Sequence, residues 1–152
     1  MELVVSKNYP LIKTILTEPT LWELEYGQGH DKENFRVDAS YTYLLVKKDG
    51  IIVGVFQVRE MTKVLLEFHS FLLPQYWGTG LSEQIPAALA AWAAANTSAH
   101  NIITMVPQAA KHVLDYLERI GAQFSGLIPN GIVYNGAFSA LYLYTYPIRR
   151  EE

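Results

Sequence analysis

The spacing of apolar residues changes period along the chain, and each period predicts a different kind of element. Over residues 8–24 the apolar positions recur three and four apart, which predicts one or two short helices interrupted near Pro19. The polar residues 26–40 that follow are expected to form a loop. From residue 41 the pattern changes to short runs of branched and aromatic residues, which are typical of β-strands.

Three strands are predicted in the first half of the chain, over residues 41–46, 51–59 and 64–73. Asp49 and Gly50 separate the first two runs, and this pair of residues accepts the positive φ angles of a tight turn. We therefore expect the first two strands to form an antiparallel hairpin.

The second half of the chain combines helices with further strands. One helix is predicted over about 83–95, and residues 108–120 predict another, because they are apolar on one helical face and end at Gly121. The further strands are expected at 101–106, 123–128 and 137–146, with a loop at 129–136 between the last two.

This order of elements predicts the fold class. Helices come first, then three strands, a helix, a strand, a helix and two strands, all within one domain spanning residues 1–152. The layout is an α/β (α+β mixed sheet) arrangement with an antiparallel first half and a crossover helix after the third strand.

The segment between the third strand and the next helix carries the clearest chemical signal. It reads Pro74-Gln75-Tyr76-Trp77-Gly78-Thr79-Gly80-Leu81-Ser82. Two glycines let the backbone approach a ligand closely, and the first amide groups of the helix have no intrahelical partners. Such a turn can hold a phosphate or pyrophosphate at the positive end of the helix dipole. A plain tight turn with no ligand is the alternative.

Composition narrows the range of partners. The chain has 152 residues, half of them hydrophobic, and a net charge of −3, so nucleic acid is not expected as the main partner. It has no cysteine, which excludes disulfides, thiolate nucleophiles and thiolate metal sites. We find no signal peptide or membrane-spanning run and therefore expect a cytoplasmic protein with no membrane partner. The four histidines are scattered, and no metal site is expected.

On these residues the chain resembles GNAT-type N-acetyltransferases. That family has this order of elements and a motif Arg/Gln-x-x-Gly-x-Gly/Ala, which Gln75, Gly78 and Gly80 satisfy, whereas Trp77 replaces the Arg or Gln of the commoner frame. The resemblance covers about residues 41–146, and a weaker one is to divergent, phage-encoded members. It implies a GNAT-like acyl-CoA N-acyltransferase fold with mostly antiparallel strands, a parallel central pair and flanking helices.

The resemblance also implies acetyl-CoA (coenzyme A) as co-substrate. Its pyrophosphate would lie on the amides of the glycine turn, and its pantetheine arm would lie along the strand before the turn. The residues implied in binding are Phe71, Leu73, Gly78, Thr79, Gly80, Leu81, Ser82 and Gln108.

Acetyl transfer to a primary amine needs a base, because an amine with a pKa of about 10.4 is almost fully protonated at neutral pH. Glu67 and His69 are two apart on the third predicted strand, so they point to the same face just ahead of the turn. Members of the resembled family often place a base on this strand. A solvated or edge-capping role is the alternative for both residues.

The family's usual acid is a Tyr four residues before the Gly that ends the next helix, and Leu117 occupies that position here. Tyr116 is one residue away, about 100° around the helix, and is the candidate acid. Packing against the sheet is its alternative. In the first loop, His30, Asp31 and Glu33 occupy the region where the family often forms its acceptor site, unless the loop is merely polar.

The resemblance implies an N-acetyltransferase that moves an acetyl group from acetyl-CoA to a primary amine, and the attack would be direct, since no cysteine can form an acyl-enzyme. The acceptor would be a small molecule or a peptide, and the chain could form a homodimer. One alternative is a GNAT-shaped binding or structural protein without catalysis, which Trp77, Leu117 and Ala122 suggest. The other is a nucleotide-binding module, which the lack of Gly-Lys-Ser/Thr after the glycines disfavours.

Overall fold

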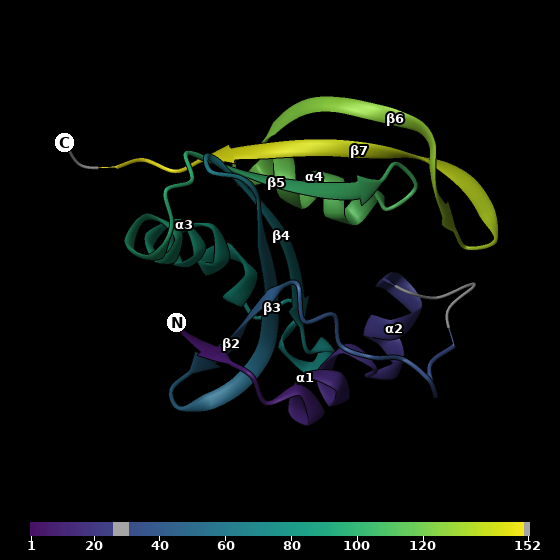
Figure 1. Ribbon diagram of the computed structural model, residues 1–152. Helices are drawn as coiled ribbons and strands as arrows, with labels where there is room; N and C mark the ends of the chain where they lie inside the picture. The colour runs from purple at the N-terminus through teal and green to yellow at the C-terminus, as the bar shows by residue number, and fades with distance from the viewer. Residues whose placement is uncertain (26–30, 151–152) are drawn as a thin grey trace.

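The computed structural model describes residues 1–25 and 31–150. Within these residues, seven strands form one sheet in the order β1-β2-β3-β4-β5-β7-β6, with helices on both faces (Figure 1). The strands are β1 (Glu2–Ser6), β2 (Thr42–Lys48), β3 (Ile51–Thr62), β4 (Leu65–Leu72), β5 (Asn101–Pro107), β6 (Gln123–Tyr134) and β7 (Ala137–Pro147). The helices are α1 (Tyr9–Leu16), α2 (Pro19–Glu25), α3 (Ile85–Asn96) and α4 (Lys111–Arg119), with short 3₁₀ helices η1 (Pro74–Tyr76) and η2 (Leu81–Gln84).

The sheet is mixed, as predicted. Strands β1 to β4 are antiparallel neighbours, β4 and β5 are parallel, and β5, β7 and β6 are again antiparallel. The parallel pair requires a crossover, and α3 supplies it between β4 and β5. The expected fold class, with a parallel central pair in a mostly antiparallel sheet, is therefore confirmed.

The β2–β3 hairpin forms at the predicted turn. Asp49 has a φ of 52° and Gly50 a φ of 78°, so both central residues adopt the left-handed conformation that a tight turn of this kind requires. The two short N-terminal helices are also confirmed, and they are separated at Thr17 and Glu18 just before Pro19.

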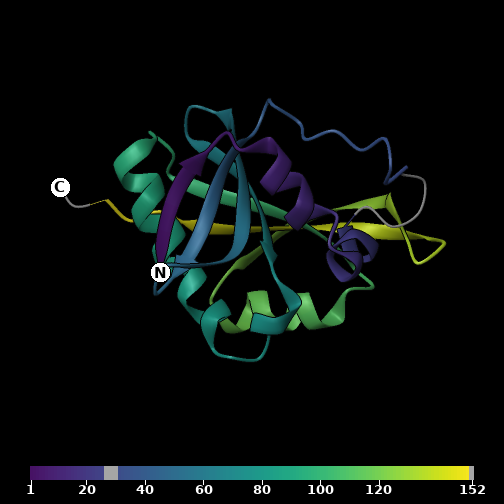
Figure 2. The ribbon, with the colours of Figure 1, turned by 90° about the horizontal axis from the view of Figure 1, so that it is seen from below.

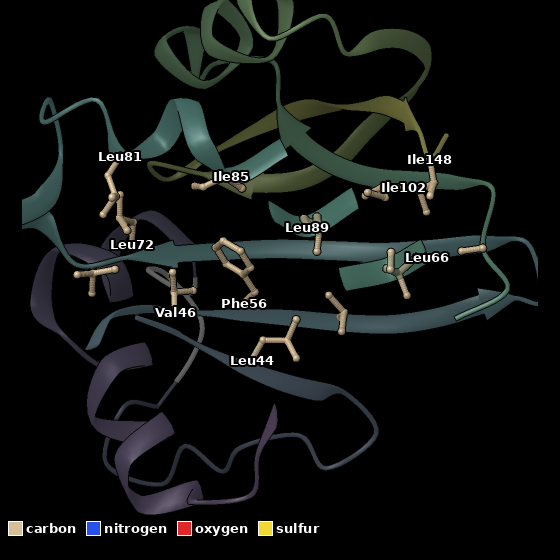
Figure 3. Close-up of a cluster of buried hydrophobic side chains, with 14 residues drawn as sticks. Leu44, Val46, Phe56, Leu66, Leu72, Leu81, Ile85, Leu89, Ile102 and Ile148 are labelled. Atoms are coloured by element: carbon tan, nitrogen blue, oxygen red, sulfur yellow. The ribbon is translucent and has the colours of Figure 1, made fainter. Parts of the chain in front are cut away.

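Alternation along the strands divides the core between the two faces of the sheet. On one face, apolar residues of β2, β3 and β4 pack against α3, as Leu44, Phe56 and Leu89 do in Figure 3. On the other face, Tyr43, Val55 and Phe71 pack against α1 and α2. Figure 2 shows α3 and the two N-terminal helices separated by the strands.

Strand β1 was not predicted. It pairs with β2 over its whole length, from Glu2 opposite Lys47 to Ser6 opposite Tyr43. Its five residues lie at the edge of the sheet and carry little pattern of their own, so β1 can be recognised only together with its partner.

The loop predicted at 129–136 was wrong. Strand β6 continues to Tyr134 with a register irregularity between Ile128 and Ile132, and only Asn135 and Gly136 form the turn. Pro129 is tolerated inside β6 because β6 is an edge strand, where a residue without a backbone N–H need not break a hydrogen bond to a neighbouring strand.

Candidate cofactor and catalytic site

The two parallel strands at the centre of the sheet separate part-way along their length. Their pairs are Leu65 with Asn101, Leu66 with Ile102, and Glu67 with Ile103. Beyond Glu67, β4 stays paired with β3 and β5 stays paired with β7. A gap therefore opens between β4 and β5, and Glu67 is the last residue of β4 before it.

A cavity of about 340 Å³ lies at this gap. Its walls include Phe68, Ser70 and Leu72 of β4, together with residues of β5, α3 and α4. Leu21 of α2 also lines the cavity, and this side chain packs with Phe71 on the opposite face of the sheet. The cavity thus passes between the separated strands and reaches both faces.

The glycine turn forms one mouth of the cavity. Gly78 and Gly80 have φ angles of 72° and 83°, and a Cβ added to either would meet no neighbouring atom within 4 Å. The first hydrogen bond of η2 runs from the Glu83 amide to the Gly80 carbonyl. The amides of Leu81 and Ser82 precede it and have no partner within the helix. Open space and unpartnered donors at one turn fit a phosphate group.

Hydrogen bonds hold this turn in place. The Trp77 indole donates to the Leu72 carbonyl at 2.8 Å, and the Thr79 hydroxyl donates to the Tyr76 carbonyl at 2.6 Å. The residue that replaces the family's Arg or Gln therefore fastens the turn to the end of β4. Pro86 is the second residue of α3, within its first turn, where no intrahelical hydrogen bond is lost.

The backbone of β4 offers different groups to the cavity from those we expected. The Leu73 amide donates to the Val53 carbonyl of β3 and is therefore occupied. Successive residues of a strand direct their backbone groups to opposite sides, so Ser70 and Leu72 face the gap while Phe71 and Leu73 face β3. Phe71 also buries its side chain on the α1 face of the sheet.

Glu67 lies in a buried cluster on the α2 face of β4. Its side chain is 3% exposed, and both carboxylate oxygens are 3.2 Å from Nη2 of Arg59, which lies opposite on β3. The Arg59 guanidinium also stacks over the Tyr41 ring, 4.1 Å from its centre. Burial, with the nearby Glu67 carboxylate, raises the pKa of Tyr41 to about 12.

His69 lies next to this cluster, as the alternation along β4 predicts. Its Nε2 is 3.6 Å from a Glu67 carboxylate oxygen, and its ring meets the Tyr41 ring edge-on. Burial lowers the pKa of His69 below its ordinary value of 6.5, although the Glu67 charge acts in the opposite direction. The imidazole is therefore neutral at pH 7, the form that can accept a proton.

Tyr116 lines the cavity at the turn rather than beside His69. Its hydroxyl donates to the Ser82 carbonyl at 2.6 Å, and burial raises the pKa of Tyr116 to about 12. Leu117, at the family's usual acid position, is buried in a cluster under β7. Arg119, one turn further along α4, pairs with Glu83 of η2 at 2.8 Å.

The other predicted residues that the structure describes lie away from the cavity. Gln108 is exposed between β5 and α4, where its backbone N–H donates to the Ala140 carbonyl, and it does not line the cavity. Asp31 and Glu33 are exposed in the first loop. His30 is outside the described residues. Among the residues that are described, no three His, Asp or Glu side chains gather as a metal site requires.

Sequence reasoning missed Tyr41, Arg59 and Arg119. Arg59 meets Glu67 because β3 and β4 pair in a register that places the two residues opposite each other, and Tyr41 joins them because β2, which begins at Thr42, pairs with β3 at Val58. Opposite charges at paired positions of two predicted strands are a usable signal once a register is assumed. The pairing of Arg119 with Glu83 joins residues 36 positions apart and has no local sequence signal.

A family model described as "Protein of unknown function (DUF2824)" matches residues 22–152. No curated protein matches the chain. Several solved structures share its fold. A chimera of the Vibrio cholerae spermidine N-acetyltransferase SpeG and hSSAT superposes with a TM-score of 0.78 and 13% identity, covering 97% of this chain and 96% of that one.

The spermidine N-acetyltransferase from Vibrio cholerae in complex with CoA and spermine also has a TM-score of 0.78, with 11% identity, 97% of this chain covered and 95% of the other. The chain therefore has the GNAT fold of these N-acetyltransferases, as its sequence indicated. The comparisons give no support for a phage origin. No helix in the described part of the chain has the length and apolar character needed to cross a bilayer.

Proposed function

The chain belongs to the family described as "Protein of unknown function (DUF2824)", and we propose that it is an N-acetyltransferase that moves an acetyl group from acetyl-CoA to a primary amine. One observation carries this proposal: the cavity runs from the glycine turn, through the gap between β4 and β5, to the face of the sheet on which His69 projects. A ligand held at the turn can thus extend a reactive end toward a base on the far side.

The residues around the cavity fit coenzyme A. The amides of Leu81 and Ser82 would hold its pyrophosphate, with Gly78, Thr79 and Gly80 forming the turn. The free backbone groups of β4, at Ser70 above all, would bind the amides of the pantetheine arm. Bound acetyl-CoA would supply an acyl group activated as a thioester.

We assign the base to His69 rather than to Glu67. The Glu67 carboxylate is already paired with Arg59, whereas His69 is neutral at pH 7 and has one ring nitrogen free. With Nε2 protonated and facing Glu67, Nδ1 accepts the proton of the incoming amine. Glu67 then orients the imidazole and stabilises its charged form.

The leaving thiolate needs a proton, and Tyr116 remains our candidate for the acid. With a pKa of about 12 its hydroxyl keeps its proton throughout the neutral range. To donate that proton it must release the Ser82 carbonyl, which it contacts in the structure.

The acceptor is a primary amine of a small molecule or a peptide. A polyamine is the first to test, because the Vibrio cholerae enzyme with this fold was solved with spermine. The second candidate function is a GNAT-shaped binding protein without catalysis. The burial of Leu117 where the family has its acid favours it.

Calorimetry with acetyl-CoA and CoA tests the proposal first. We expect binding of both, and no heat at millimolar ligand would exclude both the enzyme and an inactive cofactor binder. Release of free thiol with a panel of polyamines, amino acids and peptides then tests catalysis. Binding without thiol release from any acceptor would favour the second candidate function.

The pH profile should respond to Glu67→Gln in a defined direction. The groups that face His69 are Glu67, Arg59 and Tyr41, and only Glu67 raises the pKa of His69. Without that charge the pKa of His69 falls further below 6.5. We therefore expect the acid limb of kcat/KM to move to lower pH, with activity retained at about pH 8.

The same experiment separates the two base candidates. If Glu67 were the base, Glu67→Gln would abolish activity across the whole pH range rather than move the acid limb. Glu67→Asp, which keeps the charge, should leave the limb near its original position.

A further inference from the structure

We propose that Arg119 binds the diphosphate of coenzyme A, and that it leaves Glu83 to do so. This inference rests on the proposed function, since it concerns the same turn and cavity. It assigns the site's cation to α4, a part of the chain that the glycine motif does not include.

The turn itself has no positive side chain. Residues 74–84 contain no Lys or Arg, so the cation that a diphosphate requires must come from elsewhere in the chain. The turn also carries a negative charge, because Glu83 lies in η2, two residues after the free amide of Leu81. A bound diphosphate would be repelled by that carboxylate unless a cation offset it.

Arg119 is placed to supply this charge. It lines the cavity together with Gly78 and Ser82, and its Nη2 is 2.8 Å from the Glu83 carboxylate. The hydrogen bond from Tyr116 to Ser82 holds α4 against the same turn. The Arg119 guanidinium lies 5.6 Å from the centre of the Tyr116 ring, on the side of α4 that meets the turn.

Arg119 gains stronger bonds when it exchanges Glu83 for the diphosphate. The Arg119 and Glu83 side chains are 58% and 48% exposed, and an ion pair at that exposure contributes little. A guanidinium binds two phosphate oxygens at once, with stronger, charge-assisted hydrogen bonds. Lys48, another cation near the turn, donates to Gln84 and does not line the cavity.

The test is calorimetric titration of CoA into the full chain and its variants. Arg119→Gln should weaken CoA binding by roughly 10- to 100-fold, because it removes charge-assisted bonds to phosphate. Glu83→Gln should instead tighten binding by roughly twofold or more, because it removes both a competitor for Arg119 and a repelling charge. Lys111→Gln, the same charge change about 12 Å away on the same helix, should leave CoA affinity within about twofold.

The opposite signs of the two effects distinguish this role from a structural one. If the pair only fastened α4 to η2, both variants would weaken binding, and that result would overturn the proposal. A loss for Arg119→Gln that disappears with dephospho-CoA, which lacks only the 3′-phosphate, would also overturn it. No binding of CoA by the unmodified chain would remove the proposed function as well. Thermal unfolding of each variant checks that it folds.

Discussion

Replacement of His69 by Gln is expected to lower kcat/KM for acetyl transfer by about 10²- to 10⁴-fold, the contribution of a positioned general base. Glutamine keeps polarity and approximate size but has no nitrogen that can accept a proton at neutral pH. Since His69 does not line the cavity that would hold CoA, the affinity for CoA should not change. Steady-state kinetics and calorimetry measure the two quantities separately.

His100→Gln is the matched control, because His100 is exposed immediately before β5 and does not line the cavity. It should retain full activity. Activity of His69→Gln within about threefold of the unmodified enzyme would remove His69 as the base. A loss of activity matched by an equal loss of CoA affinity would assign the residue to binding instead.

The second large effect concerns Gly54 on β3. A Cβ added there would clash with the Phe71 carbonyl oxygen and would lie 2.9 Å from the Leu72 Cα, both backbone atoms of β4. Backbone atoms cannot rotate away as the end of a flexible side chain can, so Gly54→Ala must push the end of β4 outward. We expect a loss of about 3 kcal/mol in the free energy of unfolding, at the upper end of the usual cost of overpacking.

Denaturant unfolding of Gly54→Ala measures this loss. Gly50→Ala is the comparison, because its Cβ would meet open space and only the positive φ makes it costly, by about 1 kcal/mol. A cost for Gly54→Ala no larger than that of Gly50→Ala would mean that β4 can move at this point. The displaced segment carries Leu72, which fastens the glycine turn, so CoA affinity should fall as well.

Most of the fold was predictable because its signals are local. The Asp49-Gly50 hairpin, the apolar run of β5 and the one-sided pattern of α4 each depend on a few neighbouring residues. The elements that were missed depend on a partner. Strand β1 is defined by its pairing with β2, and β6 extends past Pro129 only because it pairs with β7.

The features of the site also fall into those with a local sequence signal and those that depend on a partner. That Glu67 and His69 share a face follows from the alternation of a single strand, and the glycine turn follows from its motif. Two other features depend on the register between β3 and β4. They are the pairing of Arg59 with Glu67 and the hydrogen bond from the Leu73 amide to the Val53 carbonyl. The contact of Arg119 with Glu83 depends on how α4 packs against η2, which no local pattern predicts.

Because β4 and β5 pair only over Leu65–Glu67, the sheet consists of two halves, β1 to β4 and β5 to β7, that are joined at one end. The core cluster under α3 crosses this joint, since it includes Ile102 of β5 and Ile148 just after β7, whereas the cluster under α4 belongs to the second half alone. A change in the angle between the halves would therefore have to repack the cluster under α3. The width of the gap is thus coupled to core packing on one face of the sheet.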